Sequence, residues 1–382
     1  MTRRHIYSHT SLRGIAALLV VFYHLQFGAA FRFSWETATP FFGKGYLWVD
    51  LFFILSGFVI AYSAQADERA PYNWPEIRTF WIARFARIYP LHFICLLALL
   101  GIKLTFAVLG PLIGKQLVGP DQWSAGSWLN FFEQLFLLNA WGLTGRVGWN
   151  IPSWSISAEM FAYLLFPALA ALLARGGRGA VLLVVAAALA FYGWVAATDG
   201  DLDIVKGLAT ARCLAGFSVG MILFLLRTRI ARLPDGVLGL LQMVALAFVL
   251  PTLLLGLNDV VAIPGFVLLV AATWTDRGWL AKPLALRPLV WLGEISYSVY
   301  LVHVVLLAPW VSMAPGPLAR LGLSPEAIRA LIMVSALVLV LGVASFTYRF
   351  VEQPARKAIV RWFANRRTRV ATPALHAPDR LT

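Results

Sequence analysis

The chain has 382 residues, of which 60% are apolar and only 13% are charged, and its mean hydropathy is +0.76. Soluble globular domains carry about 25% charged residues, so this composition excludes that class and predicts a polytopic membrane protein. A net charge of +14 suggests nucleic-acid binding in a soluble protein, but here the cations lie in short loops between apolar runs, and no nucleic-acid partner is expected. Cys95 and Cys213 fall in apolar runs without metal-ligand spacing, so neither a disulfide framework nor a zinc site is predicted.

Apolar runs long enough to cross a bilayer recur along the whole chain, and we predict an all-α polytopic membrane protein with about ten transmembrane helices. The predicted spans are residues 11–29, 45–62, 88–109, 151–173, 180–197, 204–226, 236–255, 260–274, 289–310 and 327–350. A shorter apolar piece, 128–138, is predicted to be re-entrant or interfacial. The first span has a second interpretation, a signal peptide cleaved near Gly28–Ala30, but a signal peptide has no use for the two ionisable residues within it.

Lys and Arg are distributed unevenly between the two sides of these spans. With an even number of spans both termini lie on one side, and most of the 32 Lys and Arg fall on that side, including the cluster Arg227–Arg232 and the C-terminal tail. The acidic turn Asp199–Asp203 falls on the other side. Because cytoplasmic loops carry the excess of Lys and Arg, both termini are predicted to be cytoplasmic.

Two ionisable residues lie within the first span, and such groups normally face a partner or a water-filled cavity. Arg13 and His24 are eleven residues apart, which is about three turns and roughly 16 Å on a helix, so they share one face at two depths. Asp50 is the natural partner for His24, because a carboxylate orients the ring and raises its basicity, as a general base requires. The alternatives are a core histidine bonded to its neighbours and an aspartate that caps a helix at the outer interface.

Further polar residues stand at helical spacing near the ends of spans. Two guanidinium groups on one face, those of Arg84 and Arg87, suit a donor that carries phosphates, although Arg at a cytoplasmic helix end also obeys the positive-inside rule. Ser155 and Glu159 face one direction, with Tyr163 one turn beyond. That set suits a sugar hydroxyl, a histidine, or simply an interfacial helix start.

A polar stripe runs along the predicted ninth span. Ser296, Tyr300 and His303 follow one another at spacings of four and three residues. One polar stripe inside an apolar helix is typical of a cavity lining rather than of a lipid-facing surface. We therefore expect these side chains, and Glu294 with them, to line a pocket.

Six motifs occur in an order that matches a known family. They are Leu12–Ala17 with His24, Asp50–Gly57, Arg84–Pro90, Trp154–Glu159, Ser296–His303 and Glu352–Pro354. Each motif is weak alone, but together they resemble the membrane acyltransferase-3 family, whose bacterial members O-acylate, and usually O-acetylate, sugars of surface and exported glycans. The resemblance covers residues 9–358 as one membrane domain and leaves 359–382 as a basic cytoplasmic tail. The chain is similar to single-domain exopolysaccharide acetylases, with no room for the SGNH-type esterase domain that many relatives carry.

The resemblance implies an integral O-acyltransferase of the bacterial inner membrane. Its donor would be acyl-CoA, most often acetyl-CoA, on the cytoplasmic side, and its acceptor a glycan or a lipid-linked sugar presented from the other face. No bound cofactor and no metal are expected, and no oligomeric state is predicted. The pair Arg13 and His24 and the pair Arg84 and Arg87 match positions that are required in the family.

These residues give a hypothesis for the reaction, in which the three arginines hold the phosphates of CoA. His24, oriented by Asp50 or Glu159, would remove the proton of the acceptor hydroxyl as its oxygen attacks the thioester carbonyl. The remaining pocket residues are Ser155, Tyr163, Ser296, Tyr300 and His303. Direct transfer is favoured over a covalent acyl-enzyme.

Three alternatives are kept beside this hypothesis. A covalent intermediate would use Ser56, Ser155 or Ser298, none of which stands in a recognised nucleophile motif. A transporter or flippase of lipid-linked sugars would also explain ten spans and buried charges, but it predicts repeated halves with broken helices, which the sequence does not display. A structural subunit of a polysaccharide export machine would leave Arg13 and His24 without a role.

Overall fold

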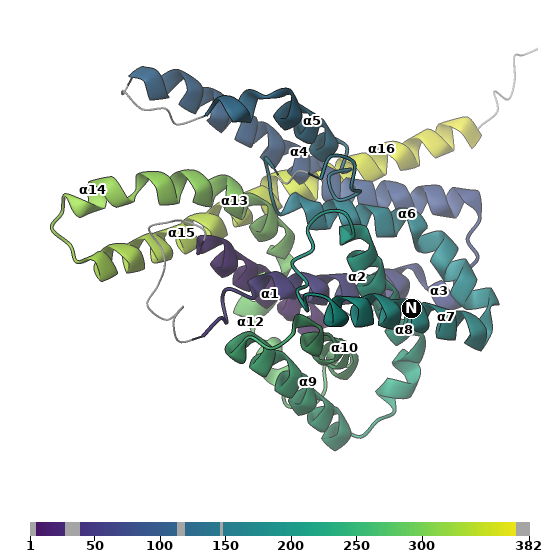
Figure 1. Ribbon diagram of the computed structural model, residues 1–382. Coiled ribbons are helices and arrows are strands. Elements are labelled where there is room, and N and C mark those ends of the chain that lie inside the picture. The colour runs from purple at the N-terminus through teal and green to yellow at the C-terminus, as the bar shows by residue number, and fades with distance from the viewer. Residues whose placement is uncertain (1–4, 27–38, 113–118, 146–147, 372–382) are drawn as a thin grey trace, which may run out of the picture.

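The computed structural model describes residues 5–26, 39–112, 119–145 and 148–371, and every regular element in these ranges is helical (Figure 1). The helices that correspond to the ten predicted spans are α1 (Tyr7–Leu25), α2 (Trp48–Ala64), α4 (Trp74–Leu112), α6 (Ser153–Arg175), α7 (Gly177–Ala197), α8 (Ala209–Ala231), α9 (Asp235–Leu255), α10 (Ala262–Thr273), α13 (Ser296–Met313) and α15 (Pro325–Thr347). The other elements are η2 (Gly45–Leu47), α3 (Ala66–Arg69), η3 (Pro120–Trp123), α5 (Ala125–Leu135), η4 (Asp259–Val261), α11 (Ala281–Leu284), α12 (Arg287–Glu294), α14 (Pro315–Ala319), the π-helical turn η5 (Tyr348–Glu352) and α16 (Gln353–Ala371).

Eight helical stretches of the described residues are long and apolar enough to cross a membrane. The two predicted spans outside this group are α1, whose 19 residues include His9, Arg13 and His24, and α10, which has only 12 residues. Helices α7, α9 and α15 expose large apolar side chains such as Leu183, Met243 and Val338, which suits contact with lipid tails. The predicted all-α polytopic membrane fold is confirmed, and the side on which the termini lie stays a prediction.

Helices α1, α2 and α8 pack closely at glycine positions near the centre of the bundle (Figure 1). Gly57 of α2 faces the backbone of Phe217 on α8, and Gly220 of α8 faces the backbone of α2, so a Cβ at either position would collide with a carbonyl oxygen. Small residues permit this close approach, which is a common basis of helix association in membranes. Helix α1 packs on α12 in the same way, where Gly14 and Gly293 meet. These contacts fix α2 against α8 and the N-terminal half of α1 against α12.

Helix α4 is longer than the third predicted span, because it runs without interruption from Trp74 to Leu112. The sequence predicts a span that begins only at residue 88, with a polar entry before it. At 1.5 Å per residue the 39 residues extend about 58 Å, well beyond the ~30 Å of a hydrocarbon core, so one end of the helix projects past the apolar layer. Arg84 and Arg87 therefore stand on a continuous helix rather than at a helix start.

The ninth predicted span is two helices, α12 and α13, separated at Ile295. The break follows Gly293, whose missing side chain lets the backbone of α12 approach the carbonyl of Thr10 on α1. Glu294 is exposed at the end of α12 and lines none of the cavities described below, so its predicted place in the pocket is wrong. The stripe of Ser296, Tyr300 and His303 lies on α13 and is buried. Ser296 and Tyr300 line a cavity, as predicted, whereas His303 lines none of the cavities described below.

The predicted re-entrant or interfacial piece, 128–138, corresponds to α5, which has 11 residues. One face of α5 buries Asn130, Glu133 and Gln134, while Leu129 and Phe132 on the other face are exposed. The possible cleavage region Gly28–Ala30 lies outside the described residues, as does the tail beyond residue 371. The first part of the predicted tail, 359–371, continues α16 as a helix.

Candidate active site

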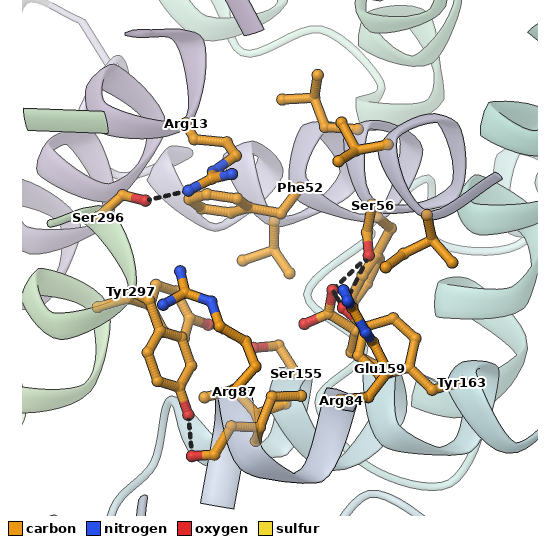
Figure 2. A pocket seen from close by; sticks show the side chains of 18 residues that line it. Arg13, Phe52, Ser56, Arg84, Arg87, Ser155, Glu159, Tyr163, Ser296 and Tyr297 are labelled. Atoms are coloured by element: carbon orange, nitrogen blue, oxygen red, sulfur yellow. Dashed lines mark hydrogen bonds between the residues drawn. The ribbon is translucent and has the colours of Figure 1, made fainter. Parts of the chain in front are cut away.

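One cavity collects the three arginines that the sequence singled out, and we call it the arginine cavity. Arg13 enters it from α1, while Arg84 and Arg87 enter from α4 (Figure 2). The other polar side chains on its wall are Ser56, Ser155, Glu159, Tyr163, Ser296, Tyr297 and Tyr300. The structure therefore brings together predicted site residues from α1, α4, α6 and α13 that lie up to 287 residues apart in sequence.

The three guanidinium groups have different partners. The Arg13 guanidinium donates to the Gly293 carbonyl oxygen at 3.1 Å and to the Ser296 hydroxyl at 3.5 Å. Arg84 lies with its guanidinium carbon 5.6 Å from the centre of the Phe80 ring, and its buried Nε has no hydrogen-bond partner among the described residues. Within the described residues, neither Arg13 nor Arg84 forms an ion pair with a carboxylate. Both guanidinium groups are partly buried and lack a carboxylate at ion-pair distance, although Glu159 on the same wall is close enough to attract them.

Arg87 differs from these two because it forms an ion pair with Glu352. Glu352 is buried at the end of the π-helical turn η5, and its second carboxylate oxygen accepts a hydrogen bond from the Ser298 hydroxyl at 2.9 Å. The guanidinium of Arg87 also lies over the Tyr297 ring, 5.1 Å from its centre. This arginine is held in place by side chains of two other elements, η5 and α13.

Glu159 lies on the wall of the arginine cavity and is held by two hydroxyl groups. Ser56 donates to the Glu159 carboxylate at 2.5 Å and Tyr163 donates to the same oxygen at 2.6 Å (Figure 2). His24 is not among the residues that line this cavity. The predicted role of Glu159 in orienting His24 is therefore not supported by its position, and its carboxylate instead adds a negative charge beside the arginines.

His24 lines a second cavity at the other end of α1, which we call the histidine cavity. Its wall includes three aromatic side chains with polar tips, Tyr23, Tyr46 and Trp154, and the carboxylate of Asp203. Arg13 and His24 thus face two different cavities, as expected for positions about three turns apart. Val49 and Tyr300 line both cavities, so the two meet at a thin wall made by these side chains.

The imidazole of His24 is positioned by a second histidine. Its Nδ1 lies 3.0 Å from the Val20 carbonyl oxygen and 3.2 Å from Nε2 of His303. Nδ1 of His303 lies in turn 3.2 Å from the Val299 carbonyl oxygen. A carbonyl oxygen only accepts, so each ring carries its proton on Nδ1, which makes Nε2 of His303 an acceptor for His24 and leaves Nε2 of His24 as its basic nitrogen.

Asp50 does not pair with His24, which corrects the prediction from the sequence. Its carboxylate accepts two hydrogen bonds from Arg212 of α8, at 3.0 Å from Nε and 2.7 Å from Nη2. Both side chains are fully buried, and the Arg212 guanidinium also donates to the Tyr46 carbonyl oxygen at 3.2 Å. The bidentate geometry satisfies Asp50 completely, so this residue links α2 to α8 instead of orienting a base.

The order of the motifs in the chain agrees with a comparison against known families, in which residues 6–349 match the family described as an acyltransferase domain. The chain belongs to this acyltransferase family. The acyltransferase MdmB of Streptomyces mycarofaciens is 29% identical over 88% of this chain and 85% of its own length. The peptidoglycan O-acetyltransferase OatA of Listeria monocytogenes is 25% identical over 93% of this chain, and the putative peptidoglycan O-acetyltransferase YrhL of Bacillus subtilis is 24% identical over 95%. The acyltransferase chain spans only 56% and 57% of the length of these last two relatives, and no solved structure matches it.

The other predicted pocket residues of the acyltransferase are placed as follows. Ser155 lines the arginine cavity and shares a 2.7 Å hydrogen bond with the hydroxyl of Tyr300. His303 is fully buried and lines neither cavity, because it lies behind His24. Ser298 also lines neither cavity. Among the described residues, no group of three or more His, Cys, Asp or Glu side chains is arranged to hold a metal ion.

Sequence reasoning missed two charged residues that hold the acyltransferase site together. Arg212 is one cation in the apolar run 204–226, and a search for a partner of the buried Asp50 could have found it. Glu352 belongs to one of the six motifs but was not assigned to the site, although it is the ion-pair partner of Arg87. Both pairs join helices that are distant in sequence, so residue spacing alone does not indicate them.

Proposed function

We propose that this acyltransferase transfers an acyl group, most often acetyl, from acyl-CoA to a hydroxyl of a sugar in a surface or exported glycan. The observation that carries the donor assignment is the arginine cavity, where Arg13 and Arg84 lack a carboxylate partner in the described part of the chain. Among the described residues, Glu159 is the one carboxylate on the wall of this cavity, so partly buried guanidinium groups there outnumber it, and phosphate matches their planar donor geometry. An anionic donor with phosphates supplies that missing charge.

The histidine cavity supports a sugar as the acceptor. Its volume of about 490 Å³ lies within the range of small-molecule sites. Its wall presents aromatic faces that can cover the apolar side of a sugar ring, and polar tips that can bind hydroxyl groups. Burial raises the pKa of the Asp203 carboxyl, and this group already accepts a hydrogen bond from the Tyr23 hydroxyl at 3.1 Å. A neutral hydroxyl-rich acceptor fits this wall better than a second anion.

The proposed reaction takes place where the two cavities meet. Nε2 of His24 takes the proton of the acceptor hydroxyl, and the hydroxyl oxygen attacks the thioester carbonyl carbon. The tetrahedral intermediate then collapses, the carbon–sulfur bond breaks, and the CoA thiolate leaves and is protonated. Nε2 of His303 accepts from Nδ1–H of His24 and so stabilises the imidazolium that forms in the first step. This is direct transfer, and no acyl-enzyme is required.

Membrane sidedness completes the proposal. With both termini cytoplasmic, the Arg13 end of α1 faces the cytoplasm, where acyl-CoA is made, and the His24 end faces the other side of a bacterial inner membrane. Donor and acceptor would then each stay on their own side, and only the acyl group would pass the wall of Val49 and Tyr300. A basic tail, 359–382, would lie on the donor side of the membrane domain, 9–358.

The test uses the full chain in inverted membrane vesicles with [14C]acetyl-CoA outside and glycan acceptor enclosed. Label should reach the glycan with the parent protein and not with His24→Gln at matched abundance. A matched control is His92→Gln, which removes a buried histidine that binds the Gln134 carbonyl oxygen away from both cavities. Equal transfer by the parent protein and His24→Gln would show that His24 is not the general base. Movement of a lipid-linked sugar without acyl transfer would favour the transporter alternative.

A further inference from the structure

A third cavity adjoins the arginine cavity, and we call it the vestibule. It is enclosed by the end of α2, the link from α3 to α4, the first turns of α4 and the start of α16. Arg84 lines both the vestibule and the arginine cavity, so the two spaces share one guanidinium group. With a volume of about 610 Å³ the vestibule is large enough for a group of nucleotide size.

Arg356 of α16 is a second cation on the vestibule wall, beside Arg84, that forms no ion pair among the described residues. Within the described residues it forms neither an ion pair nor a hydrogen bond, and its charge repels those of Arg84 and Arg87. Arg356 stands four residues after Glu352, on the same helical face, and Glu352 is anchored to α4 by its ion pair with Arg87. The fold thus holds Arg356 against α4 even though three cations there share a single carboxylate.

The rest of the vestibule wall suits a nucleotide rather than a simple ion. Phe80 lines the vestibule but its ring already stacks on Phe166, with centroids 4.8 Å apart, and lies under the Arg84 guanidinium. Tyr72 is the aromatic side chain on this wall on which a purine ring can stack. Tyr72 donates from its hydroxyl to the Ala64 carbonyl oxygen at 3.0 Å, and burial raises its pKa to about 12, so the phenol stays neutral beside a phosphate. Arg69, the third arginine on this wall, is already paired with Glu76. The available positive charge is therefore that of Arg84 and Arg356.

We propose that the vestibule binds the nucleotide end of the acyl-CoA, with Arg356 on a phosphate of the adenosine moiety and Tyr72 beside the adenine. This inference rests on the proposed function and extends it to a residue beyond 349, where the family match ends. The pantetheine arm then runs past Arg84 into the arginine cavity and carries the thioester toward His24.

The test combines a substitution in the protein with a truncation of the donor. The full chain, in vesicles of neutral phosphatidylcholine, is assayed with acetyl-CoA, with 3′-dephospho-acetyl-CoA and with acetyl-pantetheine. Arg356→Gln should raise KM for acetyl-CoA roughly ten- to hundredfold at unchanged kcat, which corresponds to the loss of one charged hydrogen-bond pair. Arg356→Lys should recover part of this loss. The control is Lys357→Gln, because Lys357 is exposed and lies outside the vestibule.

The donor series then locates the contact. With acetyl-pantetheine, which has no nucleotide, Arg356→Gln and the parent protein should have the same KM. With 3′-dephospho-acetyl-CoA, the difference in KM between the two proteins should shrink if Arg356 binds the 3′-phosphate. An equal loss with all three donors, or no loss with acetyl-CoA, would overturn the proposal. A loss that appears only when anionic lipid is added would assign Arg356 to a lipid headgroup and overturn it as well. If the parent transfers no acetyl group from any donor, the proposed function itself fails.

Discussion

Nε2 of His303 lies 3.2 Å from Nδ1 of His24, although the two residues are 279 positions apart in the chain. The pair replaces the carboxylate and histidine combination that the sequence suggested. A neutral imidazole whose proton is fixed by a backbone carbonyl can accept from its neighbour, but it adds no negative charge. His303 thus orients His24 without adding negative charge, so this contact raises the basicity of His24 less than an aspartate partner would.

Replacement of His303 should slow catalysis without weakening substrate binding. We expect His303→Gln to lower kcat on the order of a hundredfold, because the ring of His24 loses its orientation, while KM for acyl-CoA and acceptor stays within about twofold. Steady-state kinetics with both substrates varied checks this. An unchanged kcat, or a change confined to KM, would show that His303 only fills space.

The pair of Asp50 and Arg212 should prove structural. Asp50→Asn leaves the fully buried Arg212 without its anion and should cost about 3–5 kcal/mol of stability. The double variant Asp50→Leu with Arg212→Met removes both charges and should recover most of the thermal stability in detergent, together with activity. A double variant that is stable but inactive would return Asp50 to the reaction.

The arginines should separate into two classes. Arg13→Gln and Arg84→Gln leave no carboxylate behind, so we expect normal melting temperatures and a KM for acyl-CoA raised at least about tenfold. Arg87→Gln strands the buried Glu352 and should lower the melting temperature, and addition of Glu352→Gln should restore it. Equal destabilisation by all three single variants would contradict this division.

Tyr300 should act as a partition between the two cavities. Tyr300→Ala opens the wall and admits water, so we expect more hydrolysis of acyl-CoA for each acyl group transferred, measured as free CoA against labelled glycan. Tyr300→Phe keeps the ring and loses only the hydrogen bond to Ser155. Its ratio of free CoA to labelled glycan should therefore stay near that of the parent protein. If Tyr300→Ala left the ratio of free CoA to labelled glycan unchanged, a residue other than Tyr300 would be the barrier to water.

The spans could be predicted because lipid-facing helices must be apolar over about twenty residues, and this requirement is local in sequence. The arginines of the first and third spans could be found for the same reason, since an ionisable group in an apolar run is conspicuous. The break at Ile295 could not be foreseen, because it depends on how closely Gly293 approaches α1, which is a contact between distant segments.

The ion-pair and hydrogen-bond partners of the charged residues were harder to predict than the positions of these residues along the spans. The sequence pairs Asp50 with His24, and residue spacing does not indicate Arg212, because helix neighbours are decided by packing of the whole bundle. The same reason hides the contact of Arg87 with Glu352 and that of His24 with His303. Sequence patterns locate charged groups along each helix, and only the fold shows which of them face one another.

The wall of Val49 and Tyr300 has an electrical consequence. When the cavities on its two sides fill with water and ions, they conduct, and the membrane voltage falls mainly across this single layer of side chains instead of across the full bilayer. The free energy of one elementary charge changes by about 2.3 kcal/mol for every 100 mV of membrane voltage when the charge crosses this layer. A proton that moves to His24 on one side while a thiolate departs on the other would make acyl transfer sensitive to the energised state of the cell.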